Sequence, residues 1–285
     1  MNFRNCKEGH LNTGGSACPI NWGKVKGAIL VEHGIDVIAE LDFDVSDEWL
    51  AQCHAGGKSS IYPIGTFVEY AREGGEVQTN AVGYGGTKVT GVSPRNDTFT
   101  LDVPNEALNA SLLETKSKKW DAYFYDEDNY LYGQRDEKGN FIGIPMQSVY
   151  SNLSEHPTSG EQASHTVTFC YQDAEKYLKN IAYVKCGFDI GGALIGLTPV
   201  ELVKVTGSTY KIVEKFGGYD RSEEIAEFAS SISGIFSGVT AATFTSGVDG
   251  CGFDLTFGSG STPGLVPANA LYGQGIVGVE YVGTI

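Results

Sequence analysis

Short runs in which apolar and polar residues alternate, separated by turn residues, recur along the chain. The clearest is WDAYFYDEDNYLYGQ at residues 120–134. Its first half places two sets of side chains on opposite faces of a strand: Trp120, Ala122 and Phe124, and Asp121, Tyr123 and Tyr125. Because a period of two is typical of strands and the acidic centre is typical of a turn, this segment predicts a β-hairpin.

Comparable runs predict strands elsewhere in the chain. Two strands are expected around the His33-Gly34 turn within residues 26–45, and others at residues 64–71, 99–103 and 166–171. The C-terminal third adds strands at residues 199–205, 209–216, 238–245, 251–257 and 275–282. Helices are predicted only at residues 46–54, 105–116 and 221–233. Residues 72–88 are acidic and glycine-bearing and predict a long mobile loop.

The composition agrees with a β-rich fold, since 38 glycines and 29 phenylalanines and tyrosines accompany short β-branched runs. We therefore predict a mainly β protein with a β-sandwich or barrel body and a few short helices. Its predicted parts are an extended N-terminal arm at residues 1–23, a β-rich body at residues 24–190, and a smaller immunoglobulin-like or α+β module at residues 197–285. A change of pattern near residues 191–196 marks the boundary.

The formal net charge of −15 disfavours proteins that wrap DNA or dock on anionic lipid, because both rely on Lys and Arg to neutralise phosphate. No run approaches the ~20 apolar residues of a membrane span, and the first residues lack the apolar core of a signal peptide. We expect a protein made and kept in a cytoplasm. The cysteines are sparse and are expected to be reduced: Cys6, Cys18, Cys53, Cys170, Cys186 and Cys251.

The stretch NAVGYGGTKVT at residues 80–90 raises the question of a phosphate-binding loop. Gly83, Gly85 and Gly86 precede Thr87 and Lys88, but no Ser or Thr follows the lysine. The residues that come next predict turn and strand, whereas a phosphate loop opens a helix. The glycines are therefore interpreted as a turn between strands.

Two groups of residues carry metal-ligating atoms. Thiolates and imidazoles that suit zinc are found at Cys6, His10, Cys18, Cys53 and His54. Their spacing matches no known zinc motif. Oxygen ligands that suit calcium alternate at Asp126, Asp128 and Tyr130, but the bidentate Glu that such a loop needs is absent. Both groups, and the acids Asp42, Asp44 and Asp47, are interpreted as structural, so no metal and no cofactor is predicted.

Catalytic motifs are also missing from the sequence. GSGSTPG at residues 258–264 resembles a nucleophile elbow, but it links two predicted strands instead of joining a strand to a helix. No Cys has a convincing His and Asn partner, and no pair of carboxylates is singled out for glycoside chemistry. We predict a protein that is not an enzyme and has no catalytic residues.

Three stretches carry a resemblance to a known family: NCKEGHLNTGGSAC at residues 5–18, KKWDAYFYDEDNYLYGQRDEKGNFIGIPM at residues 118–146, and SHTVTFCYQDAEKYL at residues 164–178. They resemble virion structural proteins of tailed bacteriophages that infect Bacteroidota, and most of all major tail tube proteins. That family implies an arm, a β-sandwich or barrel body, a long loop that reaches a neighbouring subunit, and an added C-terminal domain. The helix expected at residues 221–233 departs from a plain immunoglobulin-like domain.

The resemblance implies a protein that self-assembles, for example as hexameric rings, into the tail tube of a virion. Its partners would be copies of itself, other virion proteins, and DNA that passes during genome ejection without specific binding; no membrane is involved. Assembly would take place in the host cytoplasm. Acids at residues 42–47, 126–128, 136 and 137 are candidates to face the conduit and repel phosphate. The alternative is a head decoration protein or a carbohydrate-binding baseplate or surface protein, in which Trp22, Trp49 and Trp120 would stack on sugars.

Overall fold

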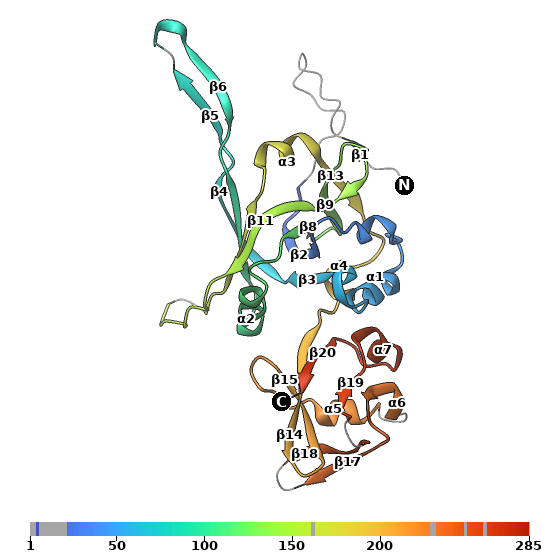
Figure 1. Cartoon of the computed structure of the whole chain (residues 1–285). Coiled ribbons are helices and arrows are strands. Elements are labelled where there is room, and N and C mark those ends of the chain that lie inside the picture. The colour runs from blue at the N-terminus through green and yellow to red at the C-terminus, as the bar shows by residue number, and fades with distance from the viewer. Residues whose placement is uncertain are drawn as a thin grey trace. The chain divides into compact units, whose positions relative to one another are not determined.

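The computed structural model describes residues 4–5, 22–81, 83–160, 163–228, 232–247, 250–258 and 261–284. The chain forms two compact units, shown in Figure 1. Unit 1 comprises Met1–Trp49 and Ile61–Leu194, and unit 2 comprises Leu50–Ser60 and Ile195–Ile285. The predicted mainly β class is confirmed, and no barrel closes among the described strands.

One half of the unit 1 sheet is built around strand β8 (Trp120–Asp126), the first strand of the predicted hairpin. On one side β8 pairs with β2, and on the other with β9 and with the start of β11. Strand β2 (Val25–Glu32) also pairs with β3 (Tyr62–Gly65). Strand β9 (Tyr130–Arg135) also pairs with β10 (Phe141–Ile142) and β13 (Ile181–Lys185), and β13 pairs with β1 (Arg4–Asn5).

The other half of the sheet folds away from β8 and forms the second layer. Its strands run in the order β11 (Ile144–Ser151), β12 (Thr166–Tyr171), β7 (Arg95–Leu101) and β4 (Phe67–Gly74). Aromatic rings fill the space between the layers, where Phe99 lies 5.5 Å from Phe124 and 5.8 Å from Phe169 between ring centroids. This core holds the second layer against β8.

Strand β8 is buried on both faces, which its alternating sequence does not reveal. The face of Phe124 meets the aromatic core, and the face of Tyr123 packs on Phe141 at 5.5 Å. Helices and their flanking residues supply the cover on that side: the part of α1 (Ser46–Cys53) up to Trp49, η1 (Val37–Glu40) and α4 (Ile190–Ala193). The predicted helices at residues 46–54 and 105–116 are confirmed as α1 and α2 (Glu106–Glu114). A further helix, α3 (Ala174–Asn180), begins at the N-cap Asp173.

The second strand expected before residue 45 is wrong, because this segment forms η1 and a turn. Ile38 and Phe43 are both buried, and their spacing of five does not fit one face of a strand. The Asp42 carboxylate also accepts a hydrogen bond from the backbone N–H of Asp44 at 3.0 Å. Such a local bond competes with strand pairing.

Unit 2 is a mixed sheet with short helices beside it. The strands run in the order β17 (Ala241–Gly247), β18 (Gly250–Thr256), β15 (Thr209–Glu214), β14 (Thr198–Thr206) and β20 (Val279–Thr284). The other elements of this unit are α5 (Ser222–Ala226), α6 (Ile232–Ile235), β16 (Phe236–Ser237), β19 (Gly264–Leu265) and α7 (Ala268–Gly273). Because β20 runs parallel to β14, this unit corresponds to the α+β alternative. The helix predicted at residues 221–233 is two short helices instead, and residues 229–231 lie outside the described part.

Unit 2 also contains residues Leu50–Ser60, so it extends beyond the module predicted at residues 197–285. His54 is fully buried and stacks on Tyr272 with ring centroids 4.6 Å apart. Its Nδ1 lies 2.8 Å from the Leu50 carbonyl oxygen, and its Nε2 accepts a hydrogen bond from the Gly278 N–H at 2.7 Å. The proton is therefore on Nδ1, and the imidazole links the two segments of this unit.

We predict that His54→Phe destabilises the protein by about 2–4 kcal/mol, because the ring still stacks on Tyr272 but two buried backbone groups lose their partners. Urea unfolding followed by circular dichroism measures the change. His156→Phe is the matched control, since His156 is exposed. Equal stability of the two variants would contradict the role given to His54.

Candidate functional site

A two-stranded ribbon extends from the second layer of unit 1 (Figure 1). It consists of residues 75–94, with strands β5 (Val77–Ala81) and β6 (Thr87–Val92), and continues the pair β4 and β7. At about 3.3 Å per residue, Tyr84 at its tip lies roughly 30 Å beyond Gly74. We call residues 75–94 the ribbon.

The ribbon replaces the mobile loop expected at residues 72–88, which is a correction. Strand pairing joins Val77 to Val92 and Ala81 to Thr87, so both sides of the glycine stretch are extended. Gly83 and Gly86 have φ angles of 52° and 76°, and strand β6 follows them where a phosphate loop would need a helix. The interpretation of the glycines as a turn between strands is thereby confirmed.

Side chains of the ribbon face solvent. Every residue of β5 is exposed, as are the first four of β6. The apolar side chains are among the most exposed in the described chain, with relative accessibilities of 60% for Val77, 70% for Val89 and 112% for Tyr84. An isolated two-stranded ribbon is marginally stable in water, so an exposed one with apolar side chains is typical of a surface that a partner covers.

Glycine defines the junction between ribbon and body. A Cβ atom at Gly74 would lie 1.9 Å from the carbonyl oxygen of Pro94, and the φ angle of 72° also favours glycine. Across the junction the Gly75 N–H donates to that same carbonyl at 3.0 Å, and the Ser93 N–H donates to the Glu76 carbonyl at 2.9 Å. The hydrogen-bond ladder therefore continues from body to ribbon through a close backbone contact.

A buried ion pair fixes the base of the ribbon. The Asp97 carboxylate, 2% exposed, accepts from Arg95 Nε at 2.9 Å and from Nη2 at 2.7 Å. The hydroxyls of Tyr70 and Tyr171 donate to it at 3.0 and 2.7 Å. The Arg95 guanidinium also lies 4.8 Å above the Tyr171 ring and 5.4 Å from that of Tyr177. We call these five residues the ribbon root, and they join β4, β7, β12 and α3.

The protonation of the ribbon root follows from its burial and charges. Burial lowers the pKa of Arg95, but the hydrogen bonds and charge of Asp97 outweigh this and raise it. Burial first, and the Asp97 charge next, raise the pKa of Tyr70. Burial likewise raises the pKa of Tyr171 and Tyr177. The tyrosines therefore stay neutral donors around one ion pair.

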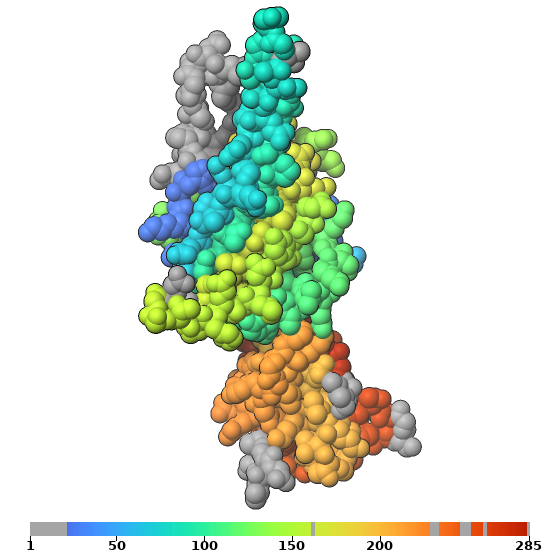
Figure 2. All heavy atoms as spheres, turned by 90° about the vertical axis from the view of Figure 1, so that its left-hand side faces the viewer, coloured from blue at the N-terminus to red at the C-terminus, as the bar shows by residue number. Residues whose placement is uncertain are grey.

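The outer side of the second layer is an open sheet face. On the side that Figure 2 presents, β4, β7, β12 and β11 lie side by side without a helix over them. Strand register assigns the outward side chains: Glu69, Ala71, Glu73, Asn96, Thr98, Thr100, Thr166, Thr168, Cys170, Ser148 and Tyr150. Thr98 and Thr168 hydrogen-bond through their hydroxyls at 3.0 Å. We call this set the open face.

Short polar side chains dominate the open face, and its only formal charges among these described positions are the two glutamates of β4. Thr168 is buried, and the other side chains of this set are exposed or half-buried, so the surface is mainly polar. Phosphate would find no cation there to pair with, because a nucleic acid binds mainly through Lys and Arg.

The structure changes the set of acids that could face a conduit. Asp126 is 2% exposed, and its carboxylate accepts from the backbone N–H groups of Asp128 and Tyr130 at 3.0 and 2.9 Å, and from the Tyr132 hydroxyl. It stabilises the hairpin turn and cannot line a channel, which is a correction. Asp128 and Glu137 are exposed and Asp136 is half-exposed. In residues 42–47 all three aspartates are exposed.

The remaining candidate residues divide between core and surface. Trp49 and Trp120 are 0% and 6% exposed, so they cannot stack on a sugar; Trp22 is exposed and stacks on Tyr132 at 4.8 Å. Of the zinc candidates, Cys53 and His54 are buried, and both His54 nitrogens already have partners. Burial raises the pKa of Cys53 to about 12, which keeps the thiol protonated. Cys6, His10 and Cys18 lie outside the described residues.

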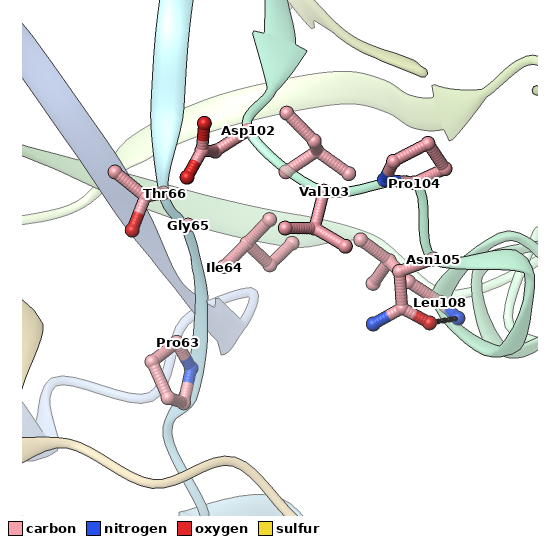
Figure 3. Close-up of a pocket in the computed structure, with 10 residues that line it drawn as sticks. Pro63, Ile64, Gly65, Thr66, Asp102, Val103, Pro104, Asn105 and Leu108 are labelled. Carbon is pink, nitrogen blue, oxygen red and sulfur yellow. Dashed lines mark hydrogen bonds between the residues drawn. The ribbon is translucent and has the colours of Figure 1, made fainter. Parts of the chain in front are cut away.

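A pocket of about 380 Å³ lies at the far end of β7, where the chain enters α2 (Figure 3). Ile64, Leu101 and Leu108 supply apolar walls, and Asp102 contributes a carboxylate. Val103 at the rim is 70% exposed. Nothing in the sequence pattern indicated this pocket, because it forms where segments from residues 63–66 and 101–108 meet.

No protein-family model matches the chain, and a comparison with curated proteins finds no match either. Among the described residues, no group of three or more His, Cys, Asp and Glu side chains is arranged to hold a metal ion. None of the helices in the same part of the chain has both the length and the apolar character that a membrane crossing requires. The geometry described above leaves three candidate functional surfaces: the ribbon, the open face and the pocket.

We predict that Asp97→Ala lowers the free energy of unfolding by about 3–5 kcal/mol, because the half-buried Arg95 loses its counter-charge and the buried Tyr171 hydroxyl loses its acceptor. Urea unfolding monitored by tyrosine and tryptophan fluorescence measures the loss. Asp128→Ala removes an exposed carboxylate of the same kind and is the control. A loss no larger than that of the control would mean that the ion pair does not hold the ribbon root.

Proposed function

We propose that the protein is a structural protein that assembles with copies of itself. The observation that carries this proposal is the ribbon, which places apolar side chains such as Tyr84 and Val89 in solvent at the end of a fixed β-structure. Exposed apolar residues in a disordered loop would say little about a partner. Here they lie on ordered strands that are exposed to solvent, and such strands offer a surface on which another chain can pack.

The assembly that we propose is the tail tube of a bacteriophage virion, formed in the host cytoplasm together with other virion proteins. The resemblance suggests this role, and the open face supports it. A wall of Thr, Asn and Ser side chains with the acids Glu69 and Glu73 suits a conduit, because DNA must pass it without being held. The net charge of −15 would also repel DNA phosphate. In this role the protein is not an enzyme.

The alternative role as a head decoration or carbohydrate-binding surface protein receives less support from the side chains. Sugar stacking needs exposed aromatic rings, and two of the three tryptophans are in the core. Trp22 has one ring face occupied by Tyr132. Self-assembly through the ribbon is therefore the role that the geometry supports best.

We predict that replacing residues 75–94 by Asn-Gly abolishes assembly and leaves unit 1 folded. Gly74 and Arg95 are opposite each other in the β4–β7 ladder, so a two-residue turn can connect them. Electron microscopy of concentrated protein should show rings or tubes for the wild type and single particles for the variant. Circular dichroism and thermal unfolding check the fold. Rings or tubes formed by the shortened chain would exclude the ribbon as the connection.

We further predict that two lysines on the open face create salt-sensitive DNA binding. In Thr100→Lys with Tyr150→Lys, both ammonium groups would lie on the wall proposed to face DNA. Assembled variant should retain DNA in a pull-down at ~50 mM salt and release it near ~200 mM, whereas wild type retains none. Leu113→Lys with Leu178→Lys adds the same charge on the exposed sides of α2 and α3. Equal retention by this control would show that the open face is not in contact with DNA.

A further inference from the structure

The base of the ribbon and the pocket lie at opposite ends of strand β7. Strand β7 begins at Arg95, beside the ribbon, and ends at Leu101, which is the first residue of its segment to line the pocket. The seven residues of β7 separate the two by about 20 Å, and the ribbon adds its own length in the other direction. A tip at one end and a cavity at the other allow identical copies to join head to tail.

The side chains that line the pocket indicate what kind of group can bind there. Its walls are mixed: Ile64, Leu101 and Leu108 are apolar, Thr66 and Asn105 are polar, and Pro63 and Pro104 also line it. Asp102 is exposed at this site and supplies the negative charge. In Figure 3, Val103 and Asp102 lie on the same loop, so a bound group could contact an apolar side chain and a carboxylate at the same time. A group that combines an apolar ring with a nearby cation fits this surface.

The ribbon tip has that combination. Tyr84 is fully exposed, and its ring can lie against apolar walls while its hydroxyl contacts polar groups or water. Lys88 is the only formally charged residue in residues 77–92 of the sequence. Residues 77–92 contain no carboxylate, so this segment is cationic although the whole chain has a net charge of −15. It is complementary to a pocket whose single charged residue is Asp102.

We infer that the ribbon tip of one copy docks in the pocket of the next, with the Tyr84 ring against the apolar walls and Lys88 beside Asp102. This inference rests on the proposed self-assembly and specifies its contact. The interface is heterologous, because each copy uses its tip on one neighbour and its pocket on the other. Such contacts repeat without limit or close into a ring, so they build extended assemblies and not isolated two-fold dimers.

A charge-reversal pair tests the contact in the full-length protein. Lys88→Asp and Asp102→Lys should each raise the concentration needed for assembly about tenfold or more, because like charges then face each other. The double variant restores the opposite pair and should return this concentration close to the wild-type value. Sedimentation velocity over a concentration series gives the values. Lys138→Asp, at an exposed turn, is the matched control and should leave them unchanged.

A second measurement locates the tip directly. A photoreactive phenylalanine analogue in place of Tyr84 should cross-link to a peptide from residues 101–108 of another copy, identified by mass spectrometry. Cross-links to a different segment, or loss of assembly in Lys88→Asp without rescue by Asp102→Lys, would overturn the pocket as the receptor and leave self-assembly standing. If wild-type protein stays monomeric at all concentrations, both the proposed function and this inference fail.

Discussion

The buried ion pair between Arg95 and Asp97 is the interaction on which the ribbon depends. Both residues are on β7, and their neighbours come from β4, β12 and α3, so one carboxylate joins every element at the ribbon root. A buried charge is costly unless it is paired and hydrogen-bonded, and here Arg95, Tyr70 and Tyr171 all donate hydrogen bonds to Asp97. The direction of the ribbon is therefore set by a network that tolerates little rearrangement.

The residues that stabilise unit 1 are different from those that are exposed for contact with other molecules. The aromatic core between the two layers and the second cover over Tyr123 bury β8 completely, which stabilises unit 1 without help from the ribbon. The ribbon and the open face remain in solvent and are free to meet other molecules. Their side chains differ accordingly: apolar groups and one lysine at the ribbon tip, hydroxyls and amides on the sheet.

Alternating sequence predicted the hairpin that contains Trp120 and the helices that begin near Ser46 and Glu106, because these are local patterns. It could not predict that Asp126 is buried, since an Asp in a turn is usually solvated and its burial depends on Tyr132 from the next strand. The ribbon was missed because Val77 pairs with Val92 and Val89 pairs with Thr79 while Val77 and Val89 stay exposed, so no buried apolar face marks these strands. The pocket depends on segments distant in sequence and has no local pattern.

The central claim is that the ribbon is covered by another copy of the chain. Amide hydrogen exchange of residues 77–92, compared between dilute and concentrated protein, tests it most directly, because a bare two-stranded ribbon opens readily and a docked one does not. The account predicts fast exchange in the dilute sample and strong slowing on concentration, confined in unit 1 to the ribbon and its receptor. Exchange of these amides at the same rate in both samples, while particles grow in size, would contradict it.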